Sequence, residues 1–130
     1  PTEMSIYGVE NMRYPSVNIR RYTLRTDGFV SVNAGFAGGE FTTKPLVFEG
    51  GELELNYSTS AVGSVQVEIQ DAEGHVLPGY GLADCSEKFG DEIDGVMLWK
   101  AGPSVGDMAG RAVQLRFVLK DADLYAFRFR

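Results

Sequence analysis

The last nineteen residues alternate between apolar and polar side chains in two successive runs, 112–120 and 124–130. In the first run Val113, Leu115, Phe117 and Leu119 fall on one face, and in the second Tyr125, Phe127 and Phe129 do so. A period of two matches a β-strand with one buried face and does not match a helix. The sequence therefore predicts two strands here, joined by a corner at Asp121-Ala122-Asp123.

The same alternation recurs along most of the chain. It is clearest in residues 52–58 and 64–70, where every second residue is apolar and the residues between are expected to face water. The inward positions are Leu53, Leu55, Tyr57, Val65, Val67 and Ile69. Eight or nine short strands separated by turn residues predict an all-β, two-sheet antiparallel β-sandwich of jelly-roll or concanavalin-like type.

Two local signals predict how strands and turns connect. Asp71-Ala72-Glu73-Gly74 has the form of a type I turn that closes strand 64–70 against a short strand around Val76. Residues 104–110 predict at most one short helical turn, with the Ser104 hydroxyl as its cap and Gly110 at its end.

The expected domain boundary follows Ser16. We interpret residues 1–16 as a linker or entry strand and residues 17–130 as one sandwich domain. Val17 and Ile19 lie on the opposite face from Tyr22 and Leu24, which predicts a bulge near residues 20–21. Asp27-Gly28 then predicts a hairpin turn into strand 29–34.

Charge and composition exclude some classes of partner. The formal net charge of −6 argues against a nucleic-acid binder. No apolar stretch approaches the ~20 residues of a membrane helix, so no membrane partner is expected. A single cysteine forbids an internal disulfide and leaves the compartment open. Neither the oligomeric state nor the localisation follows from this sequence.

Catalytic chemistry has few candidates. One histidine and one cysteine cannot supply a zinc site. His75 follows a turn glycine, where an exposed imidazole is expected, and Cys85 is expected to be a small buried thiol. Because no recognisable catalytic set is present, we expect this chain not to be an enzyme.

Carboxylates are the one catalytic residue type that is numerous. Asp121 and Asp123 at the final corner are candidates for a structural calcium site, and calcium is the one cofactor that the sequence suggests. The alternative is that both side chains cap the backbone of the corner. A glycosidase pair would require two carboxylates facing each other across a sugar, which sequence cannot show.

The stretch from Pro78 to Lys100 combines aromatic and polar residues suited to binding a sugar. The candidate ligand-binding residues are Tyr80, Asp84, Asp91, Trp99 and Lys100. Trp99 has an alternative as a core residue whose indole N–H finds a buried partner, and the core reading is favoured.

A family resemblance covers nearly the whole chain from about Arg20 onward. The segments that carry it are Arg20–Gly35, Phe41–Gly50, Leu53–Gly74, Pro78–Cys85, Phe89–Lys100 and Val113–Arg130. Together they resemble the C-terminal β-sandwich module that follows a propeller-type, family-32-like glycoside hydrolase domain in bacterial proteins. In such proteins the catalytic carboxylates belong to the propeller.

The resemblance implies a non-catalytic accessory module that packs on a glycosidase domain and presents an apolar patch to it on an outer sheet face. Residues 1–16 then look like the tail of that upstream domain or the linker from it. The alternatives, in order of preference, are a stand-alone carbohydrate-binding module and a small glycosidase.

Overall fold

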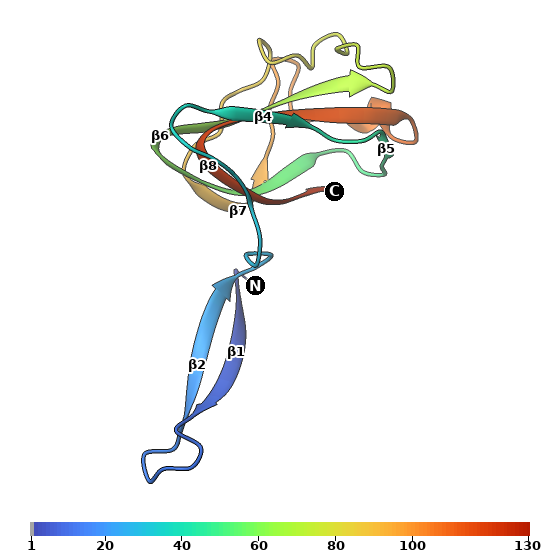
Figure 1. The fold of residues 1–130 in the computed structure, drawn as a ribbon. Helices are drawn as coiled ribbons and strands as arrows, with labels where there is room; N and C mark the ends of the chain where they lie inside the picture. Colours follow the sequence, from blue (N-terminus) through green and yellow to red (C-terminus); the bar gives the residue numbers. More distant parts are fainter. Residues whose placement is uncertain (1) are drawn as a thin grey trace. The chain divides into compact units, whose positions relative to one another are not determined.

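The computed structural model describes residues 2–130, in which it has eight β-strands and one 3-10 turn (Figure 1). The all-β prediction is confirmed. The chain divides into two compact units, the first ending at Val30 and the second covering Ser31–Arg130.

The first unit is a two-stranded antiparallel hairpin made of β1 (Glu3–Glu10) and β2 (Asn18–Arg25). Its register runs without a break from Glu3 opposite Arg25 to Glu10 opposite Asn18, so the bulge predicted at residues 20–21 is absent. The change of face that suggested a bulge instead reflects apolar side chains on both faces of the ribbon.

Strand β2 therefore pairs with the segment before it and not with the strand that follows. The residues around Asp27 do turn, since Asp27 has a φ of 58° and the Gly28 N–H donates to the Arg25 carbonyl. The compact units divide after Val30, whereas the sequence placed the boundary after Ser16 and assigned β2 to the sandwich.

The second unit contains one six-stranded sheet. Its strands are β3 (Val32–Ala34), β4 (Gly39–Thr42), β5 (Leu46–Val47), β6 (Leu53–Asp71), β7 (Asp91–Val96) and β8 (Ala112–Phe129), and the 3-10 turn η1 spans Gly106–Met108. The order is β3-β8-β6-β7, with β4 and β5 also paired to β8. Two strands, β6 and β8, are thus much longer than the short strands expected.

These two long strands fold over together and so form both layers of the sandwich. Their pairing breaks between Thr59 and Ser64 in β6, opposite Asp121 in β8, whose φ is 42°. Phe117 and Phe127 lie on either side of this bend with ring centroids 5.4 Å apart, although ten extended residues would span about 33 Å. Hence the two halves of β8 face each other across the core.

The strands that flank each half complete the two layers. Beyond the bend, β3 and β7 pair with one half of the β6–β8 ribbon, and β4 and β5 pair with the other half. The six predicted inward residues of β6 are all fully buried, as are the four of the first run in β8.

Two expectations about exposure are wrong. The polar residues Glu54, Asn56 and Glu68, which alternate with the inward side chains of β6, are buried instead of facing water. In β8 after the bend, Ala122 and Leu124 are the buried residues, while Tyr125, which was expected to face inward, is only half-buried.

The two local signals have different outcomes. The Gly74 N–H donates to the Asp71 carbonyl, and Val76 pairs with Gln70, so the predicted turn is confirmed. The helical turn η1 exists, but it begins after Val105 and no side chain caps it, so the predicted Ser104 cap is wrong.

Candidate functional site

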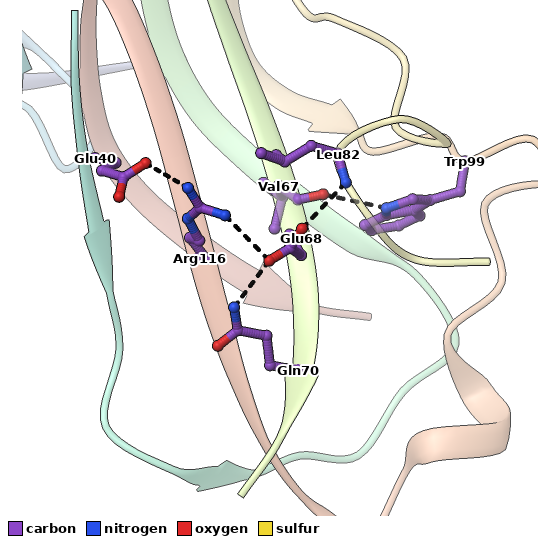
Figure 2. A network of polar contacts seen from close by, with 7 residues as sticks. All are labelled: Glu40, Val67, Glu68, Gln70, Leu82, Trp99 and Arg116. Carbon is purple, nitrogen blue, oxygen red and sulfur yellow. Dashed lines mark hydrogen bonds and ion pairs between the residues drawn. The ribbon is translucent and has the colours of Figure 1, made fainter. Parts of the chain in front are cut away.

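A network of polar and charged groups lies on the face of β6 opposite the inward side chains (Figure 2). Glu68 follows the inward Val67, so its side chain leaves the opposite face of β6. Arg116 Nη1 lies 3.3 Å from Glu68 Oε1, and its Nη2 lies 2.6 Å from Glu40 Oε2. Gln70 Nε2 donates to the same Glu68 oxygen at 2.8 Å.

The pKa of Glu68 reflects two opposing effects. Burial alone would raise it, but the hydrogen bonds from Gln70, the Leu82 N–H and Arg116 together lower it below the usual value. The carboxylates of Glu40 and Glu68 raise the pKa of the Arg116 guanidinium, and the hydrogen bond to Glu40 contributes most. Glu68 is therefore a structural carboxylate whose ionised form is favoured by its hydrogen-bond donors.

The other layer carries an equivalent arrangement. Glu54 accepts from Arg128 Nε at 2.6 Å and from Arg130 Nη1 at 3.3 Å, and the Arg128 bond is the main reason that the pKa of Glu54 is lowered. At these two places the solvent side of the sheet therefore holds ion pairs and not the apolar patch expected of an accessory module.

The long segment between β6 and β7 covers the free edge of β6. Val65 exchanges two backbone hydrogen bonds with Lys88, and Ile69 is bonded to Leu77 and Tyr80. Between them, the Val67 N–H donates to the Cys85 sulfur at 3.3 Å, and the Trp99 indole N–H donates to the Val67 carbonyl at 3.2 Å (Figure 2). Two side chains thus replace a neighbouring strand.

This arrangement decides the role of the aromatic pair predicted to bind a sugar. Trp99 is 3% exposed, so the core alternative is the one the structure has. Tyr80 packs edge-on against it with ring centroids 5.4 Å apart, and its hydroxyl donates to the Ser104 carbonyl at 2.8 Å. Trp99 is thus a core residue, whereas Tyr80 is only half-buried.

Two of the three polar members of the predicted set lie together, and the third lies elsewhere. Asp84 and Lys100 form an ion pair at 3.1 Å beside the Trp99 strand bridge. Asp91 is exposed at the start of β7, opposite Ser58. The structure brings Tyr80, Trp99, Asp84 and Lys100 into one neighbourhood and leaves Asp91 on a sheet edge.

The two candidate nucleophile or base residues are placed as the sequence predicts. The His75 side chain is 79% exposed, and its Nδ1 lies 3.1 Å from Asp71 Oδ2. Cys85 is buried, and burial raises the pKa of its thiol. The buried environment of Cys85 disfavours the thiolate that nucleophilic attack would need.

Asp121 and Asp123, the calcium candidates, make contacts of a structural kind. Asp123 Oδ1 accepts from the Ser31 hydroxyl at 2.6 Å and from Asn33 Nδ2 at 3.1 Å. The Asp121 N–H donates to the Gly35 carbonyl at 3.0 Å. Among residues 2–130, no group of three or more His, Cys, Asp or Glu side chains is arranged to hold a metal ion.

The bend of the sandwich has exposed aromatic residues that the sequence did not single out as one group. Phe36 and Phe89 are both exposed, and Lys120 lies between two shallow hollows of about 640 Å³ and 320 Å³, each lined by one of these rings. The Lys120 ammonium lies 5.0 Å from the Phe36 ring centroid. The one sequence signal for Phe36 is a bulky ring inside a glycine-rich loop.

The hairpin carries several exposed apolar side chains. Ile6 and Tyr22 are opposite each other on one face, and Val9 and Ile19 are opposite each other on the other face. These four side chains are between 46% and 74% exposed. Three further apolar residues are exposed in the connecting loop, namely Met12, Tyr14 and Val17.

The chain matches no known protein family, and no curated protein and no solved structure is significantly similar to it. In the described part of the chain, no helix has the length and apolar character needed to cross a membrane.

Proposed function

We propose that this chain is a non-catalytic accessory module that packs on a glycosidase domain of the propeller type, with the hairpin as its contact. The observation that carries the proposal is the exposure of apolar side chains on both faces of β1 and β2. The nature of the partner domain rests on the resemblance of the sequence to sandwiches that follow such propellers.

An isolated two-stranded ribbon is at best marginally stable in water, because it has no core. Burying one Val, Leu, Ile or Phe side chain fully is worth roughly 1.5–3 kcal/mol. Covering Ile6, Val9, Ile19 and Tyr22 would therefore stabilise the hairpin and bind the partner at the same time. Since both faces are apolar, a cleft or a pair of surfaces suits the ribbon better than one flat surface.

Stand-alone carbohydrate binding is the second candidate, and one observation favours it. The exposed Phe36 and Phe89 rings beside Lys120 offer stacking faces with a hydrogen-bond donor. In this second candidate the glycan would bind at the bend of the sandwich.

The test uses the chain fused to a propeller domain encoded upstream in its own reading frame. We expect Ile6→Ser combined with Ile19→Ser to lower the unfolding temperature of the fusion, because exposed hairpin positions become contacts there. Val47→Ser combined with Val76→Ser, at exposed apolar positions of the sandwich, serves as the control. Equal effects of the two pairs would refute the hairpin contact.

Two further results would refute the proposal as a whole. The first is hydrolysis of aryl glycosides by the purified chain alone. The second is a reading frame that encodes no glycosidase domain beside this one. Saturable glycan binding that is lost on Phe36→Ala and Phe89→Ala would then favour the second candidate.

A further inference from the structure

Two strand edges of the molecule carry opposite charge. Strand β2 contains three arginines, Arg20, Arg21 and Arg25, and strand β7 contains three carboxylates, Asp91, Glu92 and Asp94. β7 is the terminal strand of the order β3-β8-β6-β7, and β2 is one of the two strands of the hairpin. An edge strand presents backbone groups that a further strand can pair with.

We propose that β2 of one copy adds to the edge of β7 in a second copy, extending the sandwich sheet with the hairpin. Backbone hydrogen bonds would hold the added strand, and the opposite charges would select it. This inference goes beyond the proposed function, because it concerns strand edges and not the apolar faces of the hairpin.

The charge distribution along the chain supports a second copy as the occupant. Residues 31–130 contain eight Lys or Arg and fifteen Asp or Glu, a formal charge of −7, whereas residues 2–30 contain four and three, a formal charge of +1. Each copy therefore offers one basic strand and one acidic edge. Two reciprocal contacts would close a symmetric dimer.

Charge disfavours pairing between like strands. β1 has a glutamate at each end, so antiparallel pairing of two β1 strands would place Glu3 opposite Glu10 of the other copy. Pairing two β2 strands would bring six arginines together. Like charges directly opposite each other across a ladder are destabilising. Of these pairings, β2 with β7 is the one that the charges favour.

The arginines remain accessible although they already have partners within the hairpin. Arg20 is paired with Glu10 and Arg21 with Glu3, yet their side chains are 60% and 50% exposed. Each guanidinium has five N–H donors, so it can meet a second carboxylate without losing the first. β2 has eight residues and β7 has six, so one strand can cover the other along its whole length.

The test is sedimentation velocity on the full chain over a range of concentrations and salt. We expect a dimer whose dissociation constant rises with ionic strength, because the contact is electrostatic. Asp91→Lys with Asp94→Lys should weaken it roughly ten-fold or more, by placing like charges across the interface. The matched control is Glu87→Lys with Asp107→Lys, two exposed positions outside the strands that give the same change in net charge.

A mixing experiment identifies the partner strand. A second chain carries Arg20→Glu and Arg21→Glu, and circular dichroism checks that it remains folded. Each reversed chain should be monomeric alone, while an equimolar mixture should dimerise, since both contacts then join opposite charges. Should the β2 variant unfold, the salt dependence of the dimer and the effect of the β7 variant still test the edge contact.

Three results would overturn the inference: a monomer at all concentrations, equal weakening by the control pair, or no recovery on mixing folded variants. Association that is insensitive to salt and lost on Ile6→Ser with Ile19→Ser would assign it to the apolar faces. That outcome would leave the proposed function standing and remove the edge contact.

Discussion

Replacing Trp99 with phenylalanine separates a core role from a sugar-binding role. The indole N–H is the group that pairs the Val67 carbonyl, at 3.2 Å, inside the covered edge of β6. Phenylalanine keeps an apolar ring but has no donor. The substitution therefore leaves a buried carbonyl without that partner and a small void beside Tyr80.

The expected loss of stability can be worked from these two effects. A buried polar group left unsatisfied costs about 1–3 kcal/mol. The atoms that phenylalanine lacks correspond to roughly one or two methylene groups of burial, at ~0.8 kcal/mol each. We therefore expect Trp99→Phe to lower the free energy of unfolding by about 2–5 kcal/mol. Tyr80→Phe, which removes a hydroxyl bonded near the surface, should cost about 1 kcal/mol or less.

Urea unfolding followed by far-ultraviolet circular dichroism measures both variants against the parent chain. Trp99 is the only tryptophan in the sequence, so the parent chain should also show a fluorescence shift to longer wavelength as it unfolds. A typical hydrogen bond contributes about 0.5–1.5 kcal/mol to stability. If Trp99→Phe lowers the free energy of unfolding by less than about 0.5 kcal/mol, the assignment of Trp99 as a hydrogen-bonded core residue is contradicted. Native tryptophan fluorescence quenched by acrylamide as readily as in the unfolded chain would also contradict it.

Three other predictions concern ionisation and the bend. The pKa of Glu68 in the folded chain lies below its usual 4.5, so the contribution of Glu68 to folding stability is complete above pH 4.5 and is lost as pH falls through the folded pKa. Glu68→Gln should therefore make the free energy of unfolding, measured by urea titration, depend less on pH in the acid range. An unchanged acid dependence would contradict this prediction. Burial, followed by the Glu92 charge, raises the pKa of Tyr57 to about 12, so stability should fall between pH 10 and 12, and Tyr57→Phe should remove that step. A Cβ on Gly63 would collide with backbone at the bend, so Gly63→Ala should lower the free energy of unfolding by about 1–3 kcal/mol, measured by thermal unfolding. Gly35→Ala is the control and should be neutral, because a Cβ there meets open space. Equal effects of the two substitutions would refute the tight bend.

Alternation in the sequence was sufficient to predict the core of the sandwich but not the environment of its polar residues. Leu53, Leu55 and Val67 are buried as expected, because one face of each strand must meet the core. The same alternation predicts that Glu54 and Glu68 are exposed, because a period of two specifies only which face a residue occupies. What covers that face is set by arginines from β8, more than forty residues further along the chain.

The predicted sugar site shows the same limit. Tyr80 and Trp99 were correctly placed in one neighbourhood, because both belong to the segment around β7. Whether Trp99 faces solvent or the core depends on the edge of β6, which has no neighbouring strand beyond the bend. The Val67 carbonyl needs a hydrogen-bond donor because of the tertiary structure around it, and the local sequence does not indicate this need.

Strand β8 shows how an alternating pattern can predict the inward residues at both ends of a strand and still miss the irregularities between them. Burial steps from Leu119 to Ala122 across the bend at Asp121, which moves the inward face from odd to even positions. Opposite the register shift between Asn56 and Tyr57 of β6, Tyr125 is one extra residue in β8 and returns the inward face to odd positions. Phe127 and Phe129 therefore pack against the core, as their spacing from the first run suggests. Two offsets of one residue cancel in the pattern, and for that reason neither could be detected from the sequence.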